Sequence, residues 1–279
     1  MDKFEYKFSE NKTVDVGGVT FVYRELGAKQ GVPVIFLNHL GATLDNCDPR
    51  IMDGISTAHQ LITFDNRGVG GTEGSKPKTI AEMAKDVMSF IKALGYTKVD
   101  LIGFSMGAFI TQEILLQEPN LVRKAIMTGT GPAGGVGIAN VTKITYWDML
   151  RGLLTFRDPK FYLFFNYNEN GKKFASEFLA RLKERTENRD KAISLMSFSN
   201  QLNAIHAWGT QRPQDLSVIT QPVLIINGDN DRMVPSSNTY DLAKRISNSE
   251  LIVYKDAGHG GIFQYHEEFV QSVLKFLGN

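Results

Sequence analysis

The turn at residues 103–107 (Gly-Phe-Ser-Met-Gly) constrains the fold of this chain more than any other stretch. The apolar run at residues 99–102 before it is typical of a buried parallel strand, and apolar residues return at helical spacing over residues 109–115. A turn this tight strains its central residue, and glycine on either side removes Cβ atoms that would collide. The pattern predicts that the Ser105 hydroxyl is exposed above a sheet, at the positive end of a helix. The alternative is a serine without chemistry in a glycine-rich turn.

Short apolar runs that end in polar loops recur on both sides of this turn. Residues 34–37 and 61–64 are such runs, and they are typical of central parallel strands. Thr79 and Glu82 form a capping-box sequence before a helix. Further helices are expected after Ser105, after Pro235 and at residues 267–277. The predicted strands are residues 5–8, 13–16, 19–24, 34–37, 61–64, 99–102, 125–127, 223–226 and 251–254, with a hairpin between the second and third.

The alternation of strands and helices stops between residues 131 and 213. Helical patterns occupy residues 142–154, 161–167, 172–183 and 193–208, with no strand pattern between them. We therefore expect an α/β fold in which a mostly parallel central sheet, flanked by helices, forms a core from residues 1–130 and 214–279. Residues 131–213 are expected to form an inserted helical cap, or lid.

Composition excludes several classes of function. The chain has 279 residues, of which 31 are Lys or Arg and 30 are Asp or Glu, and its basic residues form no long cluster, so nucleic acid is not an expected partner. Cys47 is the single cysteine, which rules out a disulfide within the chain, and no Cys/His spacing is typical of zinc. No apolar segment resembles a signal peptide or a membrane span. We expect a soluble, cytoplasmic protein without a metal site or a membrane partner.

A serine hydroxyl is a weak nucleophile, so it needs a base and a carboxylate that orients the base. Asp231 follows the predicted strand at residues 223–226, and His259 follows the strand at residues 251–254. The carboxyl ends of parallel strands meet at one edge of a sheet, which predicts that both residues converge on Ser105. Asp229 and Asp256 are the rival acids.

With these motifs, the chain resembles α/β-hydrolases over essentially its full length. The resemblance rests on the nucleophile-elbow turn, on Gly228-x-x-Asp231 before Val234-Pro235, on Gly258-His259, on Asp65-x-Arg67-Gly68, and on the order serine, acid, histidine. It implies an α/β-hydrolase fold with Ser105 as nucleophile, Asp231 as orienting acid and His259 as general base. It also implies an oxyanion hole made by the backbone N–H groups of Met106 and Leu40.

The implied activity is serine hydrolase chemistry on a small or medium apolar carboxylic ester or lactone, through an acyl-enzyme and without a cofactor. Residues 38–41 with Asp45 and Asp48 are similar to enol-lactonases, and the turn at residues 103–107 is similar to haloperoxidase-type esterases. Neither short match fixes a substrate. Two alternatives stay open: carbon–carbon bond hydrolysis or cofactor-free perhydrolysis (haloperoxidase chemistry) on the same triad, and a ligand-binding receptor or scaffold with little turnover.

Five side chains are candidates for the substrate pocket: His39, Phe104, Trp147, His206 and Trp208. His39 points either toward the site or into its neighbours. A further pattern, G-x-G-x-x-G at residues 129–134, is reminiscent of a dinucleotide-binding turn. Pro132 and the following glycines interrupt the helix that such a site requires, so we expect a flexible entry to the helical insertion instead.

Overall fold

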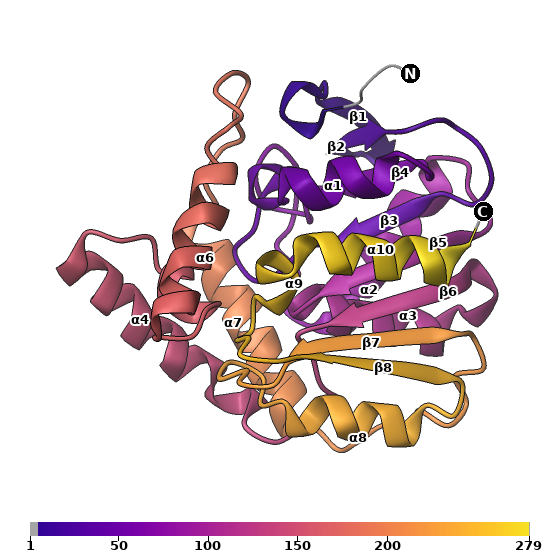
Figure 1. Cartoon of the computed structure of the whole chain (residues 1–279). Helices are drawn as coiled ribbons and strands as arrows, with labels where there is room; N and C mark the ends of the chain where they lie inside the picture. Colours follow the sequence, from indigo (N-terminus) through magenta and orange to yellow (C-terminus); the bar gives the residue numbers. More distant parts are fainter. Residues whose placement is uncertain (1–4, 279) are drawn as a thin grey trace.

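An eight-stranded sheet runs through the protein in the order β1-β2-β4-β3-β5-β6-β7-β8 (Figure 1). The computed structural model describes residues 5–278. Strands β1 and β2 form an antiparallel hairpin, β2 pairs antiparallel with β4, and all later pairs are parallel. The strands are β1 (Lys12–Val16), β2 (Val19–Leu26), β3 (Val34–Leu37), β4 (Leu61–Phe64), β5 (Val99–Phe104), β6 (Val122–Thr128), β7 (Val223–Gly228) and β8 (Ser249–Tyr254). The mostly parallel sheet expected from the sequence is confirmed.

Alternating side chains of the central strands feed two apolar cores, one on each face of the sheet. In β3, Ile35 and Leu37 join the core that α2 and α3 cover, whereas Val34 and Phe36 join the core under α1 and α10. The helices of the two faces are α1 (Pro49–Ser56), α2 (Ile80–Ala93), α3 (Met106–Gln117), α8 (Ser237–Arg245), α9 (Gly261–Gln264) and α10 (His266–Leu277). A sheet buried on both faces explains why its strands are continuous apolar runs.

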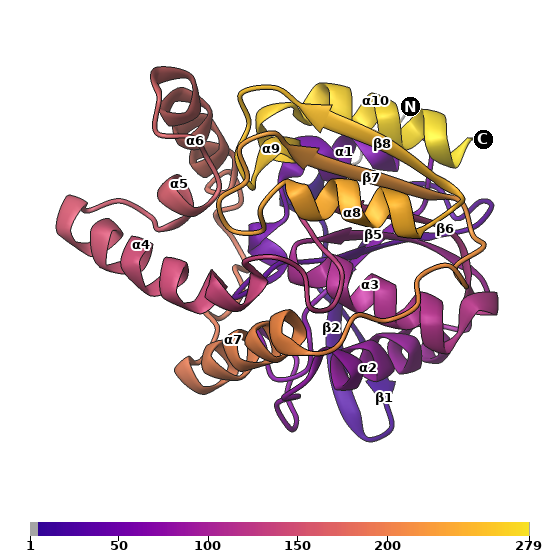
Figure 2. The same cartoon turned by 90° about the horizontal axis from the view of Figure 1, so that it is seen from below.

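Helices fill the chain between β6 and β7, and no strand lies among the described residues there. They are α4 (Val141–Thr155), α5 (Lys160–Leu163), α6 (Glu169–Arg181) and α7 (Leu195–Thr210). Figures 1 and 2 place this helical segment (residues 131–213) at one end of the sheet, beside the carboxyl ends of the parallel strands. No helix among residues 5–278 combines the length and apolarity needed to cross a lipid bilayer.

The predicted strand at residues 5–8 is wrong. Tyr6–Phe8 form a 3₁₀ helix, because the Tyr6 backbone N–H donates to Asp53 at 2.6 Å and its hydroxyl donates to the Leu44 carbonyl at 2.8 Å. These contacts with loops and with α1 replace the pairing to a neighbouring strand that a β conformation needs.

Two helices also differ from expectation. The sequence prediction missed α1, although Asp48 caps its N-terminus by accepting from the Arg50 N–H at 3.0 Å and Pro49 occupies the first turn. The helix expected at residues 161–167 is the single turn α5, which ends at Leu163. Beyond it, the Phe164 carbonyl accepts from the Gly260 N–H at 2.7 Å, so the chain bends toward the loop that carries His259.

A buried ion pair fastens the helical segment to the core. Arg181 of α6 donates to Asp48 from Nε at 3.0 Å and from Nη2 at 2.7 Å, and also to the Phe263 carbonyl at 2.9 Å. Both charged side chains are buried. A buried pair is strongly destabilising when one partner is removed, because the other charge is left uncompensated.

We therefore expect Arg181→Met to lower the free energy of unfolding by about 3 kcal/mol, measured by urea denaturation. Lys173→Met is the matched control, since Lys173 lies on the same helix in an exposed pair with Glu177 at 3.9 Å and exposed pairs contribute little. Equal effects of the two substitutions would contradict the role given to the buried pair.

Candidate active site

Ser105 lies between β5 and α3 with φ +56° and ψ −118°, a conformation that is strained for a residue with a side chain. The turn requires glycine on both sides of Ser105, because a side chain there would collide with neighbouring backbone atoms. A Cβ on Gly107 would lie 2.1 Å from the Leu37 carbonyl oxygen, and one on Gly103 would lie 2.6 Å from the Ala108 Cα. The close approaches that the sequence predicted are therefore present, and they press the start of α3 against the end of β3.

A chain of hydrogen bonds joins the three residues that the sequence singled out. His259 Nε2 lies 2.9 Å from Ser105 Oγ, and His259 Nδ1 lies 2.8 Å from Asp231 Oδ2. The other Asp231 oxygen accepts the backbone N–H groups of Met233 and Val234 at 2.8 and 2.9 Å, which fixes the carboxylate. All three side chains are buried. In this arrangement Nδ1–H donates to the carboxylate, and Nε2 is the atom that can accept the serine proton.

The rival acids have structural partners instead. Asp229 Oδ1 accepts the Ala257 N–H at 3.2 Å and the Asn230 side chain at 2.6 Å. Asp256 accepts from the side chains of three asparagines, Asn166, Asn168 and Asn170, and these hydrogen bonds lower the pKa of its carboxyl. Neither carboxylate contacts His259.

The backbone N–H groups of Leu40 and Met106 have no hydrogen-bond acceptor within the described part of the chain. Met106 begins α3, so its N–H belongs to the positive helix end. The loop that carries Leu40 is held from the helical segment, because the Gly41 N–H donates to the Gln201 side chain of α7 at 2.8 Å. Two such N–H groups near a nucleophile are the donors that an oxyanion requires.

A cavity of about 190 Å³ opens above Ser105. Most of its lining is apolar and comes from both the core and the helical segment, as is usual for small-molecule sites. The lining residues are His39, Leu40, Gly41, Ser105, Phe109, Val141, Thr145, Met149, Asp158, Pro159, Lys160, Leu163, Phe164, Phe198, Ile205, Met233, Val234 and His259.

Of the five side chains expected in the pocket, only His39 lines this cavity. Trp147 is 63% exposed on the outer face of α4, and Trp208 is buried against Phe109 with its ring centroid 5.3 Å away. His206 is exposed, with Nδ1 3.1 Å from the Ala139 carbonyl oxygen. Phe104 packs behind the site, 5.1 Å from the His259 ring. These four expectations are wrong because sequence spacing did not resolve which face of each element meets the cavity.

Both interpretations of His39 are partly correct. Its ring lines the cavity and also packs edge-on against Phe104 and Phe164. Nδ1 lies 2.8 Å from the Leu40 carbonyl oxygen, which can only accept, so Nδ1 carries the proton. Burial, followed by the nearby charge of Lys160, lowers the pKa of His39 to about 3. The ring is therefore neutral at physiological pH and braces the Leu40 loop.

Part of the cavity lining could have been predicted from the spacing of residues along α4, but the sequence analysis did not include it. Val141, Thr145 and Met149 follow one another at i, i+4 spacing along α4 and all face the cavity. Trp147 lies off this row, which explains its exposure. Phe164 and Phe198 had no comparable signal, because a short turn and the start of a helix place them.

The glycine pattern at residues 129–134 does not form a dinucleotide turn. A turn and the 3₁₀ helix Ile138–Asn140 follow it, and a Cβ on Gly131 would lie 2.6 Å from the Asn238 side chain, so the backbone is already packed. Among residues 5–278, no group of three or more His, Cys, Asp or Glu side chains could hold a metal ion.

Comparisons with known proteins place the fold in a family. A family model described as "alpha/beta hydrolase fold" matches residues 32–264. The structure of an alpha/beta hydrolase fold protein from Chitinophaga pinensis is 35% identical, covers 99% of this chain and 100% of its own, and superposes with a TM-score of 0.94. The 2-hydroxy-6-oxononadienedioate/2-hydroxy-6-oxononatrienedioate hydrolase of Klebsiella pneumoniae is 29% identical over 83% of this chain and 80% of its own length. A poly(3-hydroxyalkanoate) depolymerase of Ectopseudomonas oleovorans is 26% identical over 88% and 84%, respectively.

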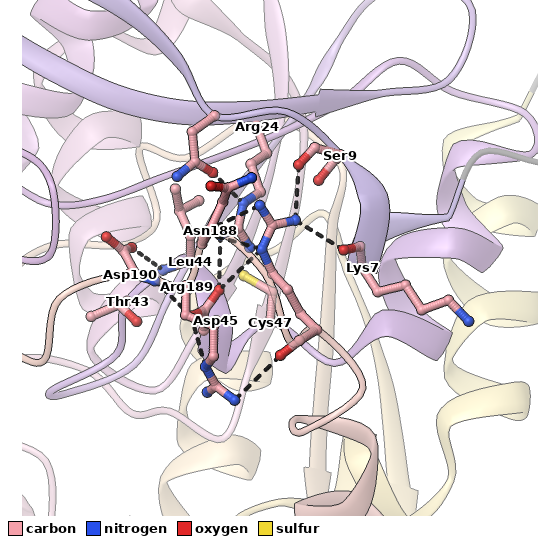
Figure 3. A network of polar contacts seen from close by, with 12 residues as sticks. Lys7, Ser9, Arg24, Thr43, Leu44, Asp45, Cys47, Asn188, Arg189 and Asp190 are labelled. Atoms are coloured by element: carbon pink, nitrogen blue, oxygen red, sulfur yellow. Dashed lines mark hydrogen bonds and ion pairs between the residues drawn. The ribbon is translucent and has the colours of Figure 1, made fainter.

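A charged network beside the site joins β2, the loop after β3 and the helical segment (Figure 3). Asp45 pairs with Arg24 at 2.8 Å and with Arg189 at 3.4 Å, and it accepts the Asp190 N–H at 2.8 Å. The Leu44 N–H faces two carboxylates, Asp65 at 2.9 Å and Asp190 at 3.3 Å. Burial, followed by the neighbouring Asp190, raises the pKa of the Asp65 carboxyl well above its ordinary range.

The raised pKa of Asp65 predicts how stability depends on pH. Between the ordinary and the raised pKa, the folded state holds a proton that the unfolded state has released, so the free energy of unfolding should fall as pH rises. Asp190→Asn removes the neighbouring charge. Between about pH 6 and about pH 9, the free energy of unfolding of this variant should therefore fall by about 1 kcal/mol less than that of the wild type.

Urea denaturation at both pH values measures this difference. Asp241→Asn is the control, because Asp241 pairs with Arg245 on the outer surface of α8. An identical pH dependence in the wild type and in Asp190→Asn would refute the coupling between the two carboxyls.

Proposed function

Because this chain belongs to the alpha/beta hydrolase fold family, we propose that it is a serine hydrolase that cleaves a small or medium carboxylic ester or lactone through an acyl-enzyme. The hydrogen-bonded line from Ser105 through His259 to Asp231, at the floor of a mostly apolar cavity, is the observation that carries this proposal. Residues 131–213 act as a cap over a core of residues 1–130 and 214–279. The cytoplasmic location stays a prediction.

In the first half of the reaction, Ser105 Oγ attacks the substrate carbonyl carbon and passes its proton to His259 Nε2. Asp231 stabilises the imidazolium that forms, and the Leu40 and Met106 N–H groups donate to the oxyanion. His259 then gives the proton to the leaving oxygen as its bond to carbon breaks. In the second half, water attacks the acyl carbon and loses a proton to His259, which returns that proton to Ser105 Oγ as the bond between Oγ and the acyl carbon breaks and the carboxylic acid leaves.

Hydrolysis of a carbon–carbon bond on the same triad is a second candidate. It is supported by the 29% identity to the Klebsiella relative, whose name gives an oxodienedioate as its substrate. The same serine and histidine would serve, but the leaving group would be a carbon atom that takes up the proton. Parallel assays with simple esters, a vinylogous diketone and peroxide-dependent bromination separate hydrolysis of esters from this candidate and from perhydrolysis.

The activated serine can be tested by intact mass after incubation with a fluorophosphonate. We expect one adduct on the wild type and none on Ser105→Ala, together with a loss of ester turnover of at least about a thousandfold in the variant.

Ser176→Ala is the matched control, because Ser176 is an exposed serine on α6 whose hydroxyl donates to the Lys172 carbonyl. It should be labelled and should turn over ester as the wild type does. A folded wild-type protein with neither an adduct nor turnover of any of these substrates would refute the hydrolase proposal and favour a ligand-binding role.

A further inference from the structure

Two charged residues, Asp158 and Lys160, line the mostly apolar cavity beside the neutral His39 and the His259 site. They lie where the chain passes from α4 to α5. The Lys160 side chain is 22% exposed, and the contacts of its ammonium with Asp158 are open to solvent. A cation at the boundary between a cavity and water can pair with an anionic group of a bound molecule, so the present partners of Lys160 are informative.

Within the described residues, the ammonium of Lys160 is paired only loosely. Its Nζ lies 3.3 and 3.4 Å from the two oxygens of Asp158, beyond the 2.7–2.9 Å or so that is usual for a charge-assisted hydrogen bond. Asp158 Oδ1 already accepts the backbone N–H of Lys160 at 2.9 Å. An ammonium has three donors, so Lys160 retains capacity for an anion that enters the cavity.

The charge of Lys160 also affects the end of the cavity where Ser105 lies. After burial, it is the largest cause of the lowered pKa of His39, whose ring lies in the same lining as Leu40 and Ser105. Thr145, on the cavity side of α4, adds a second observation: its Oγ1 is buried without a hydrogen-bond partner among the described residues. A substrate that was apolar throughout would leave the Thr145 hydroxyl without a partner and Lys160 with only its long contacts to Asp158.

We propose that Lys160 binds a carboxylate carried by the substrate, so that the cavity selects esters with one anionic end. This inference rests on the proposed function, because it assigns the substrate class of the same site. Asp158 then acts as a competing partner that holds the ammonium until a substrate carboxylate takes its place. Lys160 is thus a specificity residue and has no part in proton transfer.

The carboxylate can belong to the acyl part or to the alcohol part of the ester, and two pairs of substrates distinguish these cases. For the acyl part, para-nitrophenyl hydrogen adipate is compared with para-nitrophenyl hexanoate. For the alcohol part, the butyrate ester of para-hydroxybenzoate is compared with that of para-cresol. In each pair the measured quantity is the kcat/KM of the anionic ester divided by that of the neutral ester. A general loss of activity cancels in this ratio.

In at least one pair, Lys160→Met should lower the ratio by about tenfold, because it removes a charge partner in a partly desolvated site. Asp158→Asn should raise the same ratio by about threefold, since an amide oxygen can still accept the Lys160 N–H but no longer competes as an anion. The pair that responds identifies the part of the substrate that carries the carboxylate. Lys173→Met, on the exposed face of α6, should leave both ratios as in the wild type.

The inference is overturned if Lys160→Met changes both ratios by less than about twofold. Its failure is separable from that of the proposed function, because turnover of para-nitrophenyl hexanoate by the wild type tests the hydrolase alone. If no ester is turned over, calorimetry with monomethyl adipate tests the carboxylate site alone. Ser105→Ala should then bind it at least about fivefold more tightly than Ser105→Ala/Lys160→Met, and equal affinities would overturn the inference.

Discussion

The positive φ of the Ser105 backbone is the constraint on which the site depends. It is sustained by contacts that only glycine permits, since a Cβ on Gly107 would collide with the Leu37 carbonyl oxygen at 2.1 Å. Leu37 ends β3, and the loop with Leu40 begins there. The same close approach that strains the serine therefore brings both proposed oxyanion donors to it, and the energy of the strained turn is offset by packing in the surrounding sheet.

The helical segment supports the site as well as enclosing it. The Phe164 carbonyl accepts the Gly260 N–H at 2.7 Å, next to His259, and its ring packs on the imidazole. Gln201 holds the loop beside Leu40, while Asp190 reaches the far end of the same loop at Leu44. Movement of this segment would consequently displace His259 and the Leu40 loop together.

Sequence patterns identified the strands of the sheet and the residues that meet at its edge, because continuous apolar runs and their trailing loops are local signals. The parallel order of β3, β5, β6, β7 and β8 then brings Ser105, Asp231 and His259 together without any further information. The cavity lining was much less accessible. Trp147 and Trp208 were natural candidates for a pocket, yet the rotation of α4 and α7 about their axes puts one in solvent and the other in the core. That rotation follows from tertiary packing, which helical periodicity constrains only when a partner surface is known.

The order of the site residues along the chain has a consequence for how the protein is made. Ser105 is synthesised well before β7 and β8, the strands whose loops supply Asp231 and His259. A nascent chain that has not yet completed its last strand therefore presents the serine turn without the acid or the base, and its hydroxyl remains an ordinary alcohol. The hydrogen-bonded line from Ser105 through His259 to Asp231 therefore forms only once β7 and β8 have docked on the sheet beside β6.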